Sequence, residues 1–162
     1  MVLAAPQKTS RWEEQAEFHD YMSAVNPVMP EIPVEAFLPE LYATGESRII
    51  PMDLSSCLKT PYPCTSPNLL SSFVRINAGD VLPLATQATS HMFYVIYGEG
   101  ETRSEFGTVP WKTGDLFTSP NASELRHYAS EETVLYWVCD APLLQYLGVV
   151  PGTARFEPVL YT

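Results

Sequence analysis

Short apolar runs separated by glycine-containing turns occupy the chain beyond Gly45 and constrain its fold more than any other feature. The runs cover residues 48–52, 70–76, 81–84, 89–97, 101–106, 116–119, 125–128 and 133–139. The turn residues between them include Gly79-Asp80, Gly98-Glu99-Gly100, Gly107 and Gly114-Asp115. Runs of this length bounded by glycine predict β-strands. Short strands at this spacing predict an all-β sandwich or a closed barrel.

The residues before the strands have a different pattern, which predicts a helix followed by an extended arm. Ser10 and Glu13 read as a capping box at the start of the helix. Four apolar residues then recur at helical spacing, namely Phe18, Tyr21, Met22 and Val25. The prolines of residues 27–39 end the helix and keep the following chain extended. We expect residues 1–45 to pack on a barrel formed by residues 46–162.

Charge and cysteine content limit the class of partner and the cellular compartment. The formal net charge is −10, and the nine Lys and Arg residues form no cluster that would neutralise a row of phosphates. Nucleic acid and anionic membranes are therefore not expected partners. The sequence contains neither the roughly 20 consecutive apolar residues of a bilayer span nor the pattern of a secretory signal. Cys57, Cys64 and Cys139 make an odd number without a CxxC pair, which favours reduced thiols and a cytoplasmic location.

Three stretches combine apolar residues and glycine in an order typical of one superfamily. They are residues 94–100 (YVIYGEG), residues 111–117 (WKTGDLF) with Pro120, and residues 134–148. The first two resemble the conserved motifs of cupins, and the third is similar to the cupin halves of gentisate and hydroxynaphthoate dioxygenases. The resemblance covers residues 47–149 and implies a double-stranded β-helix, which is a jelly-roll barrel.

The first cupin motif keeps its spacing in this chain but not its metal ligands. In the family, the motif places two His and one Glu between two glycines, and the same spacing runs without a gap from Gly79 to Gly98. The two His positions then hold Ala85 and Gln87, and the Glu position holds His91. Alanine offers no lone pair to a metal, and a glutamine carbonyl is a weak donor for a transition metal.

The second motif is changed in the same way. It begins at Gly114, passes through Pro120 and places Leu125 at its His position. Leucine also lacks a donor atom, so the chain is expected to keep the barrel without a metal site of the family type.

Two histidines are expected to meet inside the barrel in place of the lost ligands. His127 is two residues beyond Leu125, so strand alternation gives both side chains the same face. His91 is expected to share the interior face with Gln87 and Ala85. We predict that His91 is the catalytic base and His127 the partner acid. The predicted substrate-binding residues are Gln87, Ala85, Leu125, Tyr94 and Tyr136.

These residues predict a small-molecule enzyme that acts on a carboxylated or aromatic metabolite. Metal-independent acid/base chemistry of the isomerase, cyclase or lyase type is expected, because ring cleavage by the relatives needs a metal to bind dioxygen. One alternative is a non-catalytic cupin that binds a small molecule. The other is an aromatic-ring dioxygenase with iron or manganese on the shifted ligands His91, His127 and Gln87, completed by Glu99 or Glu124. The first two hypotheses require no cofactor.

The predicted molecule is therefore an all-β cupin jelly-roll barrel with an N-terminal helix, an extended arm and a short C-terminal helix. That last helix is expected at residues 141–147, with Asp140 as N-cap and Gly148 at its end. Gly98 and Gly100 are expected at hairpin positions that need a positive φ. The resemblance also implies a homodimer.

Overall fold

The structure is a computed structural model that describes residue 16 and residues 20–25, 34–122 and 124–152. It divides the chain into two units, Met1–Val34 and Glu35–Thr162, and each is described by itself. In the first unit, α2 (Tyr21–Val25) is helical, and its Tyr21, Met22 and Val25 side chains are exposed. The predicted capping box at Ser10 and the predicted apolar residue Phe18 lie outside the described residues. The domain boundary after residue 45 stays a prediction.

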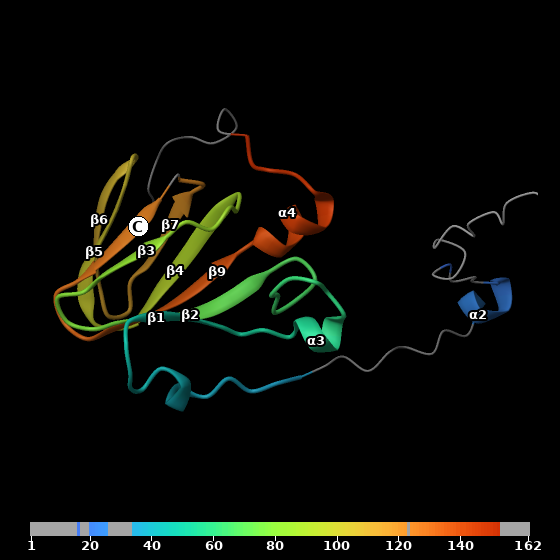
Figure 1. The fold of residues 1–162 in the computed structure, drawn as a ribbon, viewed down its shortest axis with the longest axis horizontal. Helices are drawn as coiled ribbons and strands as arrows, with labels where there is room; N and C mark the ends of the chain where they lie inside the picture. The colour runs from blue at the N-terminus through green and yellow to red at the C-terminus, as the bar shows by residue number, and fades with distance from the viewer. Residues whose placement is uncertain (1–15, 17–19, 26–33, 123, 153–162) are drawn as a thin grey trace, which may run out of the picture. The chain divides into compact units, whose positions relative to one another are not determined.

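The described residues of the second unit form nine β-strands in two antiparallel sheets (Figure 1). The five-stranded sheet has the order β1-β2-β9-β4-β7, and the four-stranded sheet has the order β3-β8-β5-β6. The strands are β1 (Arg48–Pro51), β2 (Leu70–Ile76), β3 (Val81–Leu84), β4 (Ser90–Tyr97), β5 (Glu99–Ser104), β6 (Gly107–Lys112), β7 (Leu116–Pro120), β8 (Leu125–Ala129) and β9 (Thr133–Cys139). The helices are η1 (Pro39–Leu41), α3 (Ser55–Leu58) and α4 (Ala141–Leu147), and no helix of the described residues is both long and apolar enough to cross a membrane.

The core lies between the two sheets, and alternation along each strand selects the side chains that enter it. In β4, His91, Phe93 and Val95 are buried, whereas Tyr94 between them is 41% exposed. The same alternation in β8 buries Leu125 and His127. The fold predicted from the run pattern is thus confirmed, and both histidines enter the core from opposite sheets.

One strand, β6, was not among the predicted runs. Its burial pattern does alternate, with Val109 and Trp111 buried, but Pro110 stands between them. Proline within a run argues against a central strand. In the structure β6 is an edge strand paired only with β5 among the described strands, and an edge position tolerates a residue that lacks a backbone N–H.

Two glycines at the start of β5 serve different purposes. Gly98 has a φ of +104°, as the hairpin requires. Gly100 is not among the residues with a positive φ, so that part of the prediction was wrong. A Cβ at Gly100 would instead lie 2.5 Å from the ring of Trp111 and against the carbonyl oxygen of Tyr128. Glycine is needed there because the indole lies directly over the backbone.

We expect Gly100→Ala to lower the free energy of unfolding by about 1–3 kcal/mol, because the added methyl has no space beside Trp111. Urea denaturation measures the change. Gly152→Ala is the matched control, since a Cβ there meets no atom within 4 Å and the free energy of unfolding should stay within about 0.5 kcal/mol of the wild type. Equal values for the two variants would contradict the tight contact at Gly100.

Residues 42–45 are held to the outer face of β2 by a buried arginine. The Arg75 guanidinium donates to the backbone oxygens of Tyr42 at 2.7 Å and Gly45 at 3.1 Å, and it pairs with Glu132 at 3.1 Å. The Tyr42 ring packs edge-on against Phe73, with 4.6 Å between the ring centroids. This part of the predicted arm therefore packs on the barrel.

The C-terminal helix α4 occupies the predicted residues, but its N-terminus differs from the expectation. Asp140 makes no side-chain capping bond to α4. Its carboxylate instead accepts a hydrogen bond from the Thr89 backbone N–H at 2.7 Å and another from the Thr89 hydroxyl. Asp140 thus holds the loop between β3 and β4 against the start of α4. Gly148 ends the helix with a φ of +65°, as predicted.

Candidate functional site

His91 lies on the interior face of β4 and accepts a hydrogen bond from a tryptophan. The neighbouring strand β9 places Trp137 so that its Nε1–H donates to His91 Nδ1 at 3.2 Å. An indole N–H can only donate, so Nδ1 of His91 is the acceptor and the neutral ring carries its proton on Nε2. Burial lowers the pKa of His91 to about 4, although the nearby charge of Asp140 opposes part of that shift. His91 is therefore neutral at pH 7.

His127 lies on the interior face of β8 and is fully buried. Its Nδ1 lies 2.8 Å from the hydroxyl of Thr102, its cross-strand neighbour on β5. Its Nε2 has no hydrogen-bond partner among the described residues. Burial, and secondarily the charge of His91, lowers the pKa of His127 to about 3, so this imidazole is also neutral at pH 7.

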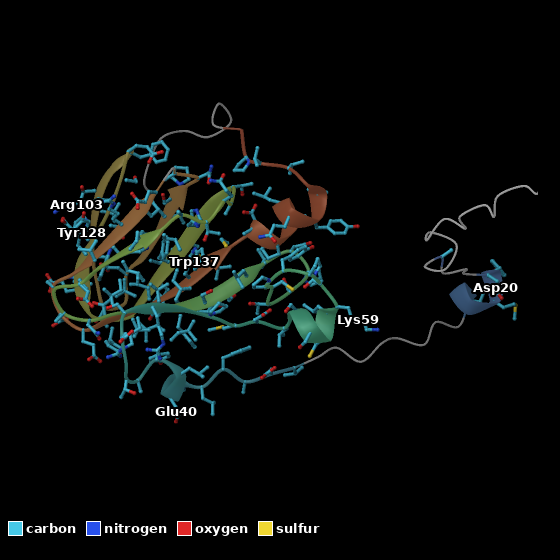
Figure 2. The ribbon with its side chains drawn as sticks, viewed as in Figure 1. Asp20, Glu40, Lys59, Arg103, Tyr128 and Trp137 are labelled. Carbon is cyan, nitrogen blue, oxygen red and sulfur yellow. The ribbon has the colours of Figure 1, made fainter. Side chains whose placement is uncertain are left out.

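Phe93 connects the two histidines. Its ring centroid lies 4.8 Å from that of His127, edge-on, and 6.3 Å from that of His91. Phe117 stacks on Phe93 at 4.9 Å, and the Trp137 ring lies at 6.3 Å in a nearly parallel orientation. Figure 2 shows Trp137 within the barrel, where it is almost fully buried. The two imidazoles thus lie in an interior walled by aromatic rings.

Two predicted site residues do not share this interior. Gln87 and Ala85 are exposed and lie in the loop before β4, which begins at Ser90. The expectation that they face inward with His91 was wrong, because strand alternation does not extend to residues before the strand. Leu125 does face inward, two residues before His127.

The two predicted tyrosines lie on the other face of the five-stranded sheet. Tyr94 and Tyr136 are direct cross-strand neighbours, and the hydroxyl of Tyr136 donates to the Ser71 hydroxyl at 3.0 Å. The structure therefore does not bring either tyrosine together with the histidines, and their contact with a substrate stays a prediction.

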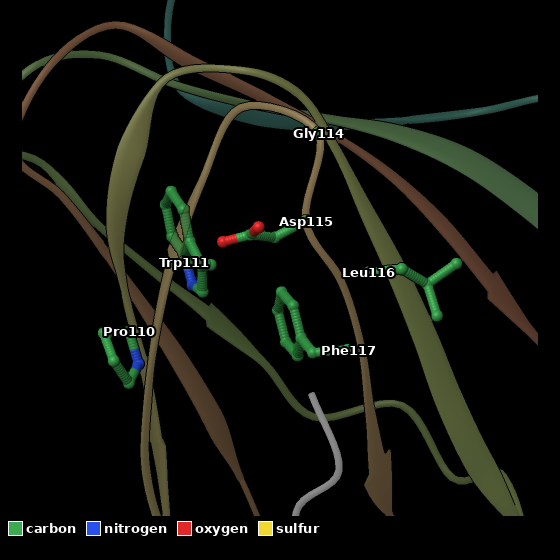
Figure 3. Close-up of a pocket in the computed structure, with 6 residues that line it drawn as sticks. All are labelled: Pro110, Trp111, Gly114, Asp115, Leu116 and Phe117. Atoms are coloured by element: carbon green, nitrogen blue, oxygen red, sulfur yellow. The ribbon is translucent and has the colours of Figure 1, made fainter.

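A pocket of about 520 Å³ lies beside the turn between β6 and β7. Figure 3 shows its lining, with the Asp115 carboxylate turned toward Trp111 and the Phe117 ring below it. Trp111 Nε1 donates to Thr102, and Phe117 stacks on Phe93. Both Thr102 and Phe93 contact His127, so a short path of packed side chains connects this pocket to the buried imidazole.

The donor atoms of the interior do not fit an iron centre of the type with two histidines and one carboxylate. His91 and His127 supply two imidazoles, and because each Nδ1 takes part in a hydrogen bond, only their Nε2 atoms are left to bind a metal. In the part of the chain that the structure describes, no three His, Cys, Asp or Glu side chains gather so as to hold a metal ion. Gln87, the third member of the shifted ligand set, is on the exposed loop.

Sequence reasoning missed two groups that decide the hydrogen bonding of the histidines. Trp137 and Thr102 contact the imidazoles only because strands far apart in the sequence are neighbours, with Trp137 bonded to His91 and Thr102 to His127. The signal in the sequence was their place in strand-like runs, which indicates burial but not the partner. Cross-strand register supplies the partner.

Comparison with known proteins agrees with this architecture. No protein-family model matches the chain, and no curated protein is significantly similar to it. Salicylate 1,2-dioxygenase from Pseudaminobacter salicylatoxidans superposes with a TM-score of 0.56 and 21% identity, over 67% of this chain and 30% of that chain. The structure of its adducts with gentisate gives a TM-score of 0.55 and 22% identity, over 67% and 28%. A variant of the same enzyme gives 0.50 and 25%, over 57% and 26%.

The present chain therefore spans less than a third of the length of these solved structures. At this level of identity the likeness shows the fold and not the activity. Together with the two antiparallel sheets, it assigns to this chain the cupin jelly-roll fold.

Proposed function

We propose that this chain is a small-molecule cupin enzyme that acts on a carboxylated or aromatic metabolite within its barrel. The proposed chemistry is metal-independent and of the isomerase, cyclase or lyase type, with His91 and His127 as the polar groups that contact the substrate. A homodimer and a cytoplasmic location remain predictions.

The observation that carries this proposal is the unpartnered Nε2 of a fully buried histidine. A buried polar atom without a partner costs about 1–3 kcal/mol, and packing alone gives no reason to keep it. The Ser72 hydroxyl, cross-strand from Trp137 in the same sheet, is a second such atom among the described residues. A small molecule with polar atoms and an aromatic or apolar body would satisfy such groups and pack on the rings around them.

The chemistry follows from the protonation state of the two imidazoles. A neutral imidazole that donates from nitrogen stabilises the negative charge that develops on a carbonyl oxygen when a proton leaves the adjacent carbon. His91 fits this donor role better than the role of base predicted from the sequence, because its Nδ1 lone pair accepts the Trp137 N–H. Because the Nδ1 lone pair of His91 is occupied, the proposed acceptor of the proton that leaves the carbon is a carboxylate of the substrate itself.

We expect His127→Phe to weaken the binding of a carboxylate probe by roughly 10- to 100-fold, the range for a lost buried hydrogen bond to a charged group. The probes are benzoate, salicylate and gentisate. Quenching of tryptophan fluorescence reports binding, since Trp137 donates to His91 and Trp111 donates to Thr102, the hydrogen-bond partner of His127. Tyr42→Phe, in the segment held to the outer face of β2, is the matched control and should leave the affinity unchanged. Equal affinities in the wild type and His127→Phe would contradict a site at His127.

Two further measurements separate the reaction classes. If the protein performs acid/base chemistry, the wild type should exchange a C–H hydrogen of the substrate for deuterium in D2O, and His91→Ala should lose this exchange. Stoichiometric iron or manganese in the purified wild type that is absent from His91→Ala would instead favour the dioxygenase alternative. In that case oxygen consumption with an aromatic carboxylate is the matching activity.

The near-complete burial of both histidines favours a second candidate function, a non-catalytic binding cupin. His91 is 2% exposed and His127 is 0% exposed, so a ligand reaches them only when side chains at the end of the barrel move. A protein that binds the probes at His127 but neither exchanges their protons nor consumes oxygen would belong to this class.

A further inference from the structure

Three buried side chains of the four-stranded sheet form a continuous line of hydrogen bonds. Trp111 Nε1 lies 2.8 Å from the Thr102 hydroxyl oxygen, and the same oxygen lies 2.8 Å from His127 Nδ1. The three residues come from the adjacent strands β6, β5 and β8. All three are almost completely buried. Gly100 makes the arrangement possible, because the indole lies over its backbone and reaches Thr102 two residues along.

Only one assignment of donors and acceptors among Trp111, Thr102 and His127 gives a partner to every N–H and O–H hydrogen that lies between them. The Trp111 N–H can only donate, so it occupies one lone pair of the Thr102 oxygen. The Thr102 hydrogen then donates to His127 Nδ1. In the reverse arrangement, Nδ1–H would donate to Thr102 and the Thr102 hydrogen would need a third partner, which the residues that the structure describes do not provide.

We propose that Thr102, held by Trp111, is a positioning residue that keeps the proton of neutral His127 on Nε2. The unpartnered Nε2–H then faces the interior as a donor for an oxygen acceptor of the ligand, a role that rests on the proposed function of this barrel. The alternative tautomer would present a lone pair at the same point. The position of one proton thus decides whether the site accepts a carboxylate oxygen or an N–H group.

The arrangement also gives the pocket beside the β6–β7 turn a structural connection to the histidine. Trp111 lines that pocket and donates the hydrogen bond that orients the Thr102 hydroxyl. A change in the position of the indole would therefore remove this orientation, and Thr102 could then either donate to Nδ1 or accept a hydrogen bond from Nδ1–H. The substitution Trp111→Phe removes the N–H donor and keeps an aromatic ring at this position.

The tautomer is measured directly on the ligand-free protein with 15N-labelled histidine, from two-bond 1H–15N spectra of the imidazoles. We expect His127 of the wild type to show an unprotonated Nδ1 and a protonated Nε2. Signals are assigned with His127→Gln. Thr102→Ser, which keeps the hydroxyl, should retain this spectrum. Thr102→Val and Trp111→Phe should both give averaged nitrogen signals, because the two tautomers become populated together.

Thr133→Val is the matched control, because its hydroxyl is equally buried but donates to the backbone oxygen of Glu131 at 3.0 Å. It should leave the His127 spectrum unchanged. A protonated Nδ1 in the wild type overturns the proposal, and so does an unchanged spectrum in Thr102→Val. If Thr102→Val does not fold, the wild type and Trp111→Phe still decide the question.

Binding of benzoate separates this inference from the proposed function. If the tautomer behaves as expected and Thr102→Val binds benzoate several-fold more weakly than Thr102→Ser, both stand. If the tautomer behaves as expected but no variant differs in benzoate affinity, the proton position is set by Thr102 and the ligand role of Nε2 is rejected.

Discussion

Replacing Phe93 with alanine should lower the free energy of unfolding by about 4 kcal/mol. The Phe93 ring is fully buried and contacts four other rings, those of His91, Phe117, His127 and Trp137. Its removal leaves a cavity between the sheets that a rigid barrel fills only in part. Urea denaturation monitored by circular dichroism measures the loss.

Tyr94→Ala is the control for this substitution, because Tyr94 is the next residue on β4 and points to the opposite face. It is 41% exposed, so its truncation should cost no more than about 1 kcal/mol. A difference of less than 1 kcal/mol between the two variants would show that Phe93 is not at the centre of the core.

Lowering the pH from 7 to 5 should reduce the free energy of unfolding by about 4 kcal/mol through the two buried histidines together. The pKa of His91 falls to about 4 and that of His127 to about 3, because burial disfavours the charged imidazole. In the unfolded chain both titrate near 6.5. Below that value the unfolded state binds protons that the folded state does not, so stability is lost as the pH falls.

Urea denaturation at pH 7, 6 and 5 tests this expectation. Most carboxylates remain ionised over this range, so the histidines dominate the slope. His127→Gln removes one of the two groups and should reduce the loss between pH 7 and 5 by about half. A free energy of unfolding that is constant over this range would mean that both imidazoles are protonated in the folded state as readily as in the unfolded state.

The sequence predicts most of this barrel because its strands alternate and its turns carry glycine. The same alternation predicts that His91 and His127 are interior, since each lies within a regular strand. It was also extended to Gln87, although the run predicted from the sequence begins at residue 89 and β4 begins at Ser90. Alternation does not hold outside a strand, and the structure places Gln87 on an exposed loop.

The hydrogen-bond partners of the histidines could not be predicted from local pattern. Thr102 faces His127 because β5 pairs with β8, and Trp137 reaches His91 because β9 pairs with β4. These pairings join strands that are separated by turns and further strands in the chain. The reassignment of His91 from base to donor depends on one such contact and therefore required the structure.

The way Arg75 binds residues 42–45 determines which substitutions the chain tolerates in that segment. Arg75 holds residues 42–45 through their main-chain oxygens, which every amino acid possesses. The side chains of Ala43 and Thr44 are therefore free to vary during evolution without loosening this attachment, whereas Tyr42 packs on Phe73 and Gly45 has a positive φ. The guanidinium itself is not replaceable by lysine, since a single ammonium group does not reach Tyr42, Gly45 and Glu132 with separate planar donors. Sequence variation should thus accumulate at Ala43 and Thr44, while Arg75 stays the same.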